Sequence, residues 1–168
     1  MFKILVPVNG SDCSLKAVDE AIRAAQESRD AVIQLVNVQP LFPRYVSRFL
    51  SRGETEAMRQ DRARQAFEPA QRRVETAGVC CTVHMLRGRI VESVAGFAAR
   101  QGVDEIVVGT SPVHGFARLL RQPIADRLIK ASDIPVDVVT AGEVSMLERY
   151  GLPAGLGIGL SMMWFANE

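Results

Sequence analysis

Short apolar segments alternate along the first 140 residues with segments in which apolar side chains recur every three or four positions. Most of the short segments are nearly continuous in apolar residues, which is typical of strands covered on both faces of a parallel sheet. We therefore predict five strands, at residues 2–8, 32–38, 79–86, 106–108 and 136–139.

The periodic segments predict four helices between these strands. Ser11 or Asp12 is placed to cap the first helix, and Gly78 and Gly102 follow the second and third. Pro69 lies inside the second helix, at 54–77, where proline removes an amide donor and predicts a kink or a break. The positions predicted to face the core are Leu15, Val18, Ala21, Ile22 and Ala25, then Met58, Ala63, Ala66, Phe67, Ala70 and Val74, then Ile90, Val94, Phe97 and Ala98, and finally Ile124, Leu128 and Ile129.

Strands that alternate with helices indicate an α/β fold: a single doubly wound, five-stranded parallel sheet flanked by four helices, over residues 1–140. The length of 168 residues and the 48% hydrophobic content fit one domain with a sizeable core. The formal net charge is only +1, so the composition predicts no general attraction to nucleic acid or to an acidic surface.

The three cysteines, Cys13, Cys80 and Cys81, show no CxxC spacing. They therefore predict neither a disulfide framework nor a zinc site, and they favour a reducing, cytoplasmic setting. Cys80 and Cys81 are adjacent in a strand, so we expect them on opposite faces in buried, inert roles. His84 shares their strand without a second metal ligand, and Ser11 is better explained as a helix cap than as a nucleophile.

The tail at residues 141–168 is apolar and rich in glycine. Gly151, Gly155 and Gly159 have the spacing of close helix packing in membranes, but the apolar stretch is short of the roughly 20 residues that a membrane span requires. The first strand is likewise too short for a signal peptide. We expect the tail to pack as an arm on its own or a partner subunit, because its apolar side chains would otherwise face water.

Four separated segments resemble the universal stress protein family: KILVPVNGSDCSLKAVDEAI, VIQLVNV, RGRIVESVAGFA, and VDEIVVGTS with a later IPVDVV. The resemblance covers about residues 1–140. It implies a five-stranded α/β fold, a homodimer formed through the last strand, and no established catalytic reaction. Members that bind ATP carry a loop of glycine, two residues, glycine, nine residues, glycine, and then serine or threonine.

The chain departs from that loop. Gly109 stands at the first glycine, but Pro112, Gln122 and Pro123 take the other two glycines and the hydroxyl. Proline offers no amide hydrogen to a phosphate, so these changes predict a loss of phosphate donors at the start of the fourth helix. Asn9 replaces the family's aspartate and brings no carboxylate to organise a metal ion.

Two interpretations of the basic residues near this loop stay open. The side chains of His114, Arg118 and Arg121, with Arg127 and Lys130 beyond them, can bind an anion in place of the missing amides. They can equally form a solvated basic face, partly balanced by Asp126. If ATP or another adenine nucleotide binds, the predicted contacts are Asn9, Val38, Gly109, Thr110, His114, Gly115, Arg118, Arg121 and Gln122; no metal ligand or catalytic residue is predicted.

Three functions follow as hypotheses. The first is a dimeric, cytoplasmic stress-response binding or signalling module whose nucleotide loop is degenerate. The second is a competent adenine-nucleotide binder of the same fold. The third is an adenylating enzyme on a related α/β fold, although VNGSDCS matches neither the SGGxDS nor the HIGH signature of such enzymes.

Overall fold

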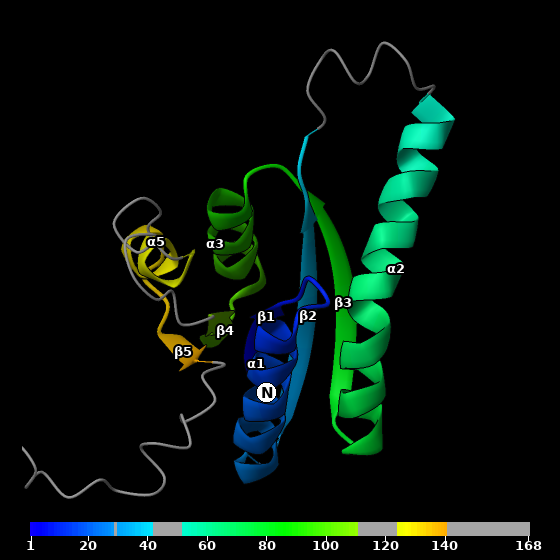
Figure 1. Ribbon diagram of the computed structural model, residues 1–168. Coiled ribbons are helices and arrows are strands. Elements are labelled where there is room, and N and C mark those ends of the chain that lie inside the picture. The colour runs from blue at the N-terminus through cyan, green and yellow to red at the C-terminus, as the bar shows by residue number, and fades with distance from the viewer. Residues whose placement is uncertain (29, 42–51, 111–123, 141–168) are drawn as a thin grey trace, which may run out of the picture.

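The computed structural model describes residues 1–28, 30–41, 52–110 and 124–140 (Figure 1). Within these ranges strands and helices alternate as predicted. In chain order they are β1 (Phe2–Pro7), α1 (Asp12–Glu27), β2 (Ala31–Gln39), α2 (Arg52–Thr76), β3 (Cys80–Arg87), α3 (Ile90–Gln101), β4 (Glu105–Thr110), α5 (Ile124–Ala131) and β5 (Val136–Thr140).

The five strands form one sheet in the order β3-β2-β1-β4-β5, and every neighbouring pair is parallel. The chain first builds outward from β1 to β3 and then crosses back to place β4 on the other side of β1. The doubly wound α/β prediction is therefore confirmed. It also places the switch point of the fold, where ligands bind in open parallel sheets, between β1 and β4.

Helices cover both faces of the sheet (Figure 1). On one face, α1 and α2 pack on Ile4, Val6, Ile33 and Leu35. On the other, α3 and α5 pack on Leu5, Val36, Ile106 and Val108. Adjacent strand residues thus enter opposite clusters, which explains why the strand sequences are apolar at nearly every position.

Helix ends follow the predicted capping chemistry. The Oγ of Ser11 accepts a hydrogen bond from the Ser14 amide at 3.3 Å, which makes Ser11 the cap of α1. Gly78 and Gly102 have φ angles of 69° and 59°, in the left-handed region that glycine tolerates.

The helix α2 runs unbroken through Pro69, so of the two predicted outcomes the break was wrong, and the kink stays a prediction. Ala66, Phe67, Ala70 and Val74 are all buried on its inner face, on both sides of the proline in sequence. Burial of this stripe offsets the lost backbone hydrogen bond, whose cost is about 3 kcal/mol. An ion pair between Arg73 and Asp19 also joins α2 to α1.

Four of the apolar side chains that were predicted to face the core are exposed: Met58 (38%), Ile90 (41%), Ile124 (42%) and Ile129 (51%). In α5 Leu128 is buried as predicted, and the other buried position is Ala125. Ile129 directly follows the buried Leu128, so it lies about 100° away around the helix and off the buried stripe.

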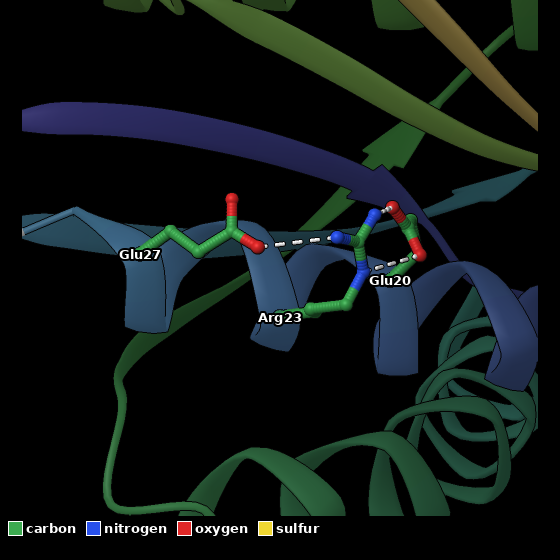
Figure 2. Close-up of polar contacts among 3 residues, drawn as sticks. All are labelled: Glu20, Arg23 and Glu27. Atoms are coloured by element: carbon green, nitrogen blue, oxygen red, sulfur yellow. Dashed lines mark hydrogen bonds and ion pairs between the residues drawn. The ribbon is translucent and has the colours of Figure 1, made fainter.

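The outer face of α1 carries an arginine between two carboxylates (Figure 2). Arg23 donates from Nε to Glu20 at 3.1 Å and from Nη1 to Glu27 at 3.1 Å. Such exposed pairs contribute little to stability.

Burial, followed by the negative charges of Asp137 and Glu20, raises the pKa of Glu105 above its usual range. Among the described helices, none is long and apolar enough to cross a membrane.

Candidate functional site

Two cavities open at the carboxyl ends of β1 and β2. The smaller, about 100 Å³, lies beside the switch point and is lined by Pro7, Val8, Asn9, Ser11, Ser14, Val36, Asn37, Val38, Ile90, Val108, Gly109 and Ile124. The larger, about 540 Å³, lies toward α2 and is lined by Asn9, Gly10, Asn37, Val38, Gln39, Pro40, Arg62, Gln65 and Ala66. Asn9, Asn37 and Val38 line both, so the two cavities meet at these residues.

The main chain of Val38 faces this meeting point. β2 extends beyond β1, since the last paired residues are Pro7 and Val36, and the Val8 amide then donates to the Val36 carbonyl at 2.8 Å. Strand geometry turns the N–H and C=O of Val38 to the same side as those of Val36. No strand residue of the described chain stands opposite Val38 on that side. It therefore presents a donor and an acceptor side by side.

An amide side chain takes the acceptor that Val38 would otherwise use. If β1 continued, the Val38 N–H would donate to the Val8 carbonyl. Instead the Nδ2 of Asn37 donates to that oxygen at 2.7 Å, and the Nε2 of Gln39 donates to the Asn37 Oδ1 at 2.6 Å. Asn37 and Gln39 are both buried. These hydrogen bonds tie the end of β2 to the last residue before the Asn9 turn, and strand geometry directs the Val38 N–H to the cavity side.

Asn9 is held by the turn that leads into α1. Its Oδ1 accepts hydrogen bonds from the Ser11 amide at 3.0 Å and from the Ser11 hydroxyl at 2.6 Å. Ser14 in turn donates from its hydroxyl to the Ser11 carbonyl at 2.8 Å. These bonds use the carboxamide oxygen of Asn9 and leave its amide nitrogen as the group that can donate to a ligand.

Apolar side chains form the walls of the smaller cavity. Ile90, at the start of α3, and Ile124, at the start of α5, both line it, together with Val108 from β4. This position accounts for the exposure of the two isoleucines: they face the cavity instead of the core. Facing apolar walls suit a flat, largely apolar group.

Gly109 has a packing role that is independent of any phosphate. A Cβ atom at this position would lie 1.9 Å from the Cys13 carbonyl oxygen and 2.4 Å from its carbon. The first turn of α1 therefore sits directly against the end of β4. Only glycine allows this approach, which brings the Asn9 turn close to the switch point.

The structure brings three of the predicted ligand contacts together: Asn9, Val38 and Gly109 all line the smaller cavity. Thr110 ends β4 and pairs with Thr140 of β5 without lining either cavity. Arg127 and Lys130 are exposed on α5 and line neither cavity. The remaining predicted loop positions, Pro112, His114, Gly115, Arg118, Arg121, Gln122 and Pro123, lie outside the described residues.

Sequence reasoning missed the side chains that form the α2 side of the site. Asn37 and Gln39 carried a signal, because amides at the end of an otherwise apolar strand are unusual in a buried sheet. Arg62 and Gln65 carried none, since they lie in a long polar helix where such residues are ordinary.

Neither the cysteines nor His84 line the two cavities. Cys80 is exposed, so its predicted burial was wrong, because β3 is an edge strand. Cys81 is half-buried, and burial, with smaller effects of Glu75 and Cys80, raises the pKa of its thiol. The His84 ring lies 4.8 Å from that of Phe97, centroid to centroid. The described residues contain no cluster of metal-binding side chains.

Comparison with known proteins identifies the fold and the family. The family model of the universal stress protein family matches residues 1–140. The chain belongs to the universal stress protein family. A universal stress protein of Methanocaldococcus jannaschii, MJ0531, is 32% identical over 140 residues, covering 82% of this chain and 81% of its own.

Solved structures of universal stress proteins share the fold. One from Burkholderia pseudomallei superposes with a TM-score of 0.64 at 22% identity, covering 82% of this chain and 94% of its own. One from Arabidopsis thaliana gives a TM-score of 0.62 at 18% identity, covering 84% and 93%. The family resemblance found in the sequence is thus confirmed over the same residues.

Proposed function

We propose that this universal stress protein is a non-catalytic stress-response binding module. It recognises an adenine ring in the smaller cavity, at the main chain of Val38, and its loop for a triphosphate is degenerate. The observation that carries the proposal is the pair formed by the Val38 N–H and C=O at the end of β2. Adenine offers the matching pattern on one edge: the ring nitrogen N1 accepts a hydrogen bond and the neighbouring amino group donates one.

The walls of the smaller cavity support the same ligand. Ile90 and Ile124 leave accessible apolar surface around it, which a flat base can cover. Asn9 lines it with an amide donor placed for a ribose oxygen or a ring nitrogen. Structurally similar family members have been solved with AMP, with cAMP and, in the protein from Archaeoglobus fulgidus, with dAMP.

The residues that follow β4 lack the groups that would bind a triphosphate tightly. Pro112, Gln122 and Pro123 replace the groups that would hold phosphate through backbone amides or a hydroxyl. Asn9 offers no carboxylate to a magnesium ion. We therefore propose that magnesium ATP binds no more tightly than AMP.

Calorimetric titration with adenosine and inosine tests base recognition. Inosine exchanges the pattern on this edge, because its N1 donates and its oxygen accepts. We expect saturable adenosine binding, and inosine binding weaker by at least about a hundredfold, since two hydrogen bonds are replaced by two clashes of like groups. Equal affinities, or no adenosine binding, would contradict the proposal.

The same titrations test the loop and the absence of catalysis. Magnesium ATP that binds more tightly than AMP, with the difference lost in an Arg118→Ala and Arg121→Ala double variant, would favour a competent triphosphate site instead. Release of pyrophosphate from ATP would revive the adenylating-enzyme hypothesis.

The proposed assembly is a homodimer formed through β5 in the cytoplasm. β5 is the edge strand beyond β4, and Val136, Val138 and Val139 are only partly buried. Its outer main-chain groups can pair with a second copy. The three free thiols support a reducing compartment.

A further inference from the structure

The sugar of an adenine ring bound at Val38 has a defined direction. A ring held by its N1 and its amino group points N9, the atom that carries the sugar, away from β2. In the sheet, β1 and then β4 follow β2 on that side. The sugar is therefore directed at the end of β4 and the starts of α1 and α5, from which Gly109, Ser11 and Ile124 line the smaller cavity.

The start of α1 already uses amides that could hold a phosphate there. The Ser11 amide donates to the Oδ1 of Asn9 at 3.0 Å, and the Ser14 amide donates to the Oγ of Ser11 at 3.3 Å. A helix start binds phosphate through free amides and the helix dipole. Because side chains of the same turn accept from these two amides, a phosphate would have to displace them.

Negative charge stands at both helix starts. Asp12 lies in the first turn of α1, and Asp126 lies in the first turn of α5. Both are exposed, and within the described residues neither forms an ion pair. Pro123, directly before α5, has no amide hydrogen to offer. These carboxylates repel a phosphate and offset the attraction of the two helix dipoles.

The cavity itself suits an uncharged ligand. Every residue of its described lining is uncharged. Its polar groups are amides and hydroxyls, and the amide nitrogen of Asn9 remains to donate to a ribose oxygen. A nucleoside can satisfy such groups without bringing a charge between Asp12 and Asp126.

We propose that the site binds adenosine, or an adenosine whose 5′ substituent is uncharged, in preference to the nucleoside phosphates. The inference rests on the proposed function, which places the base at Val38, and it names the class of ligand. A module of this kind responds to the concentration of a nucleoside and not to the phosphorylation state of the nucleotide pool.

Calorimetric titration of adenosine and AMP, without magnesium, tests the preference. We expect the native protein to bind adenosine about fivefold more tightly than AMP, since each exposed carboxylate at a helix start acts on the phosphate only modestly. An Asp12→Asn and Asp126→Asn double variant should bind AMP about as tightly as adenosine, with adenosine affinity unchanged. Added salt should also reduce the native preference, because ions screen exposed charges.

Asp133→Asn is the matched control for a general loss of negative charge. Asp133 is an exposed aspartate between α5 and β5, beyond the far end of α5, and it lines neither cavity. The preference for adenosine should keep its full size in this variant.

Two outcomes would overturn the inference and leave the proposed function standing. The native protein could bind AMP as tightly as adenosine or more tightly, and loss of that AMP affinity in the Arg118→Ala and Arg121→Ala variant would assign the phosphate to the loop instead. Alternatively, the preference could persist undiminished in the double aspartate variant. Failure of adenosine itself to bind would refute the proposed function, and the nucleoside preference with it.

Discussion

At the scale of single residues, the site depends on side chains whose role only their neighbours reveal. Asn37 resembles a polar interruption of a strand, yet it accepts a hydrogen bond from Gln39 and donates one to the Val8 carbonyl, and so ties the end of β2 to the end of β1. Gly109 resembles the first glycine of a phosphate loop, yet the Cys13 carbonyl alone is enough to require it. A residue type can thus satisfy a family pattern for a packing reason.

The packing role of Gly109 predicts a loss of stability on substitution. Gly109→Ala should lower the free energy of unfolding by roughly 2 kcal/mol, because the new methyl group overlaps the α1 backbone, which must move. Urea unfolding measures this. Gly96→Ala in α3 is the matched control: its methyl group would meet only the flexible end of Arg100, at 3.2 Å, and should stabilise the helix slightly. Equal effects of the two substitutions would refute the backbone clash.

At the scale of elements, burial outweighs local preference. α2 continues through Pro69 because the surrounding stripe packs on the sheet, whereas the isoleucines of α5 stay exposed despite their helical spacing. Helical periodicity therefore located both helices but did not decide which apolar side chains meet the core.

The unbroken α2 predicts that Pro69 is a net cost to the helix. Pro69→Ala should raise the free energy of unfolding by about 1–3 kcal/mol, since an amide donor returns and the ring clash disappears. Thermal or urea unfolding reports the change. Pro135→Ala, just before β5 and outside any helix, should bring no such gain. A less stable Pro69→Ala protein would show that the ring contributes packing that exceeds its backbone cost.

At the scale of the whole molecule, both edges of the sheet are strands with one described neighbour each, β3 and β5. β3 exposes Cys80, Thr82 and Val83, and β5 carries three partly buried valines. We propose β5, the last strand, as the edge for self-association, because pairing there would remove these valine side chains from water.

A proline at the outer edge of β5 tests the proposed dimer. The Ile106 amide donates to the Pro135 carbonyl, which turns the main chain of Val138 outward by strand alternation. Val138→Pro should therefore dissociate the dimer without removing a bond to β4. Light scattering after size-exclusion chromatography gives the mass. Val138→Thr keeps the amide and should stay dimeric, and a dimer in both variants would exclude this edge.

The same measurement addresses the proposed role of the tail as an arm packed on its own or a partner subunit. Deletion of residues 147–168 should lower the melting temperature or weaken the dimer, because apolar side chains would leave the surface that they cover. A deletion that changed neither quantity, nor solubility, would refute the arm.

The sequence by itself determined the order and type of the elements, the α/β class, and the caps at Ser11, Gly78 and Gly102, because apolar periodicity and capping depend on residues close together in the chain. It also determined the family, through segments that match it over residues 1–140. Only the tertiary structure decided that β2 extends past the end of β1 at Val38. It also decided that Ile90 and Ile124 line the smaller cavity and that Arg62 and Gln65 line the larger one. These features arise where residues far apart in the sequence meet, and no periodicity records the register of one strand against another or the side chain that a distant helix brings across.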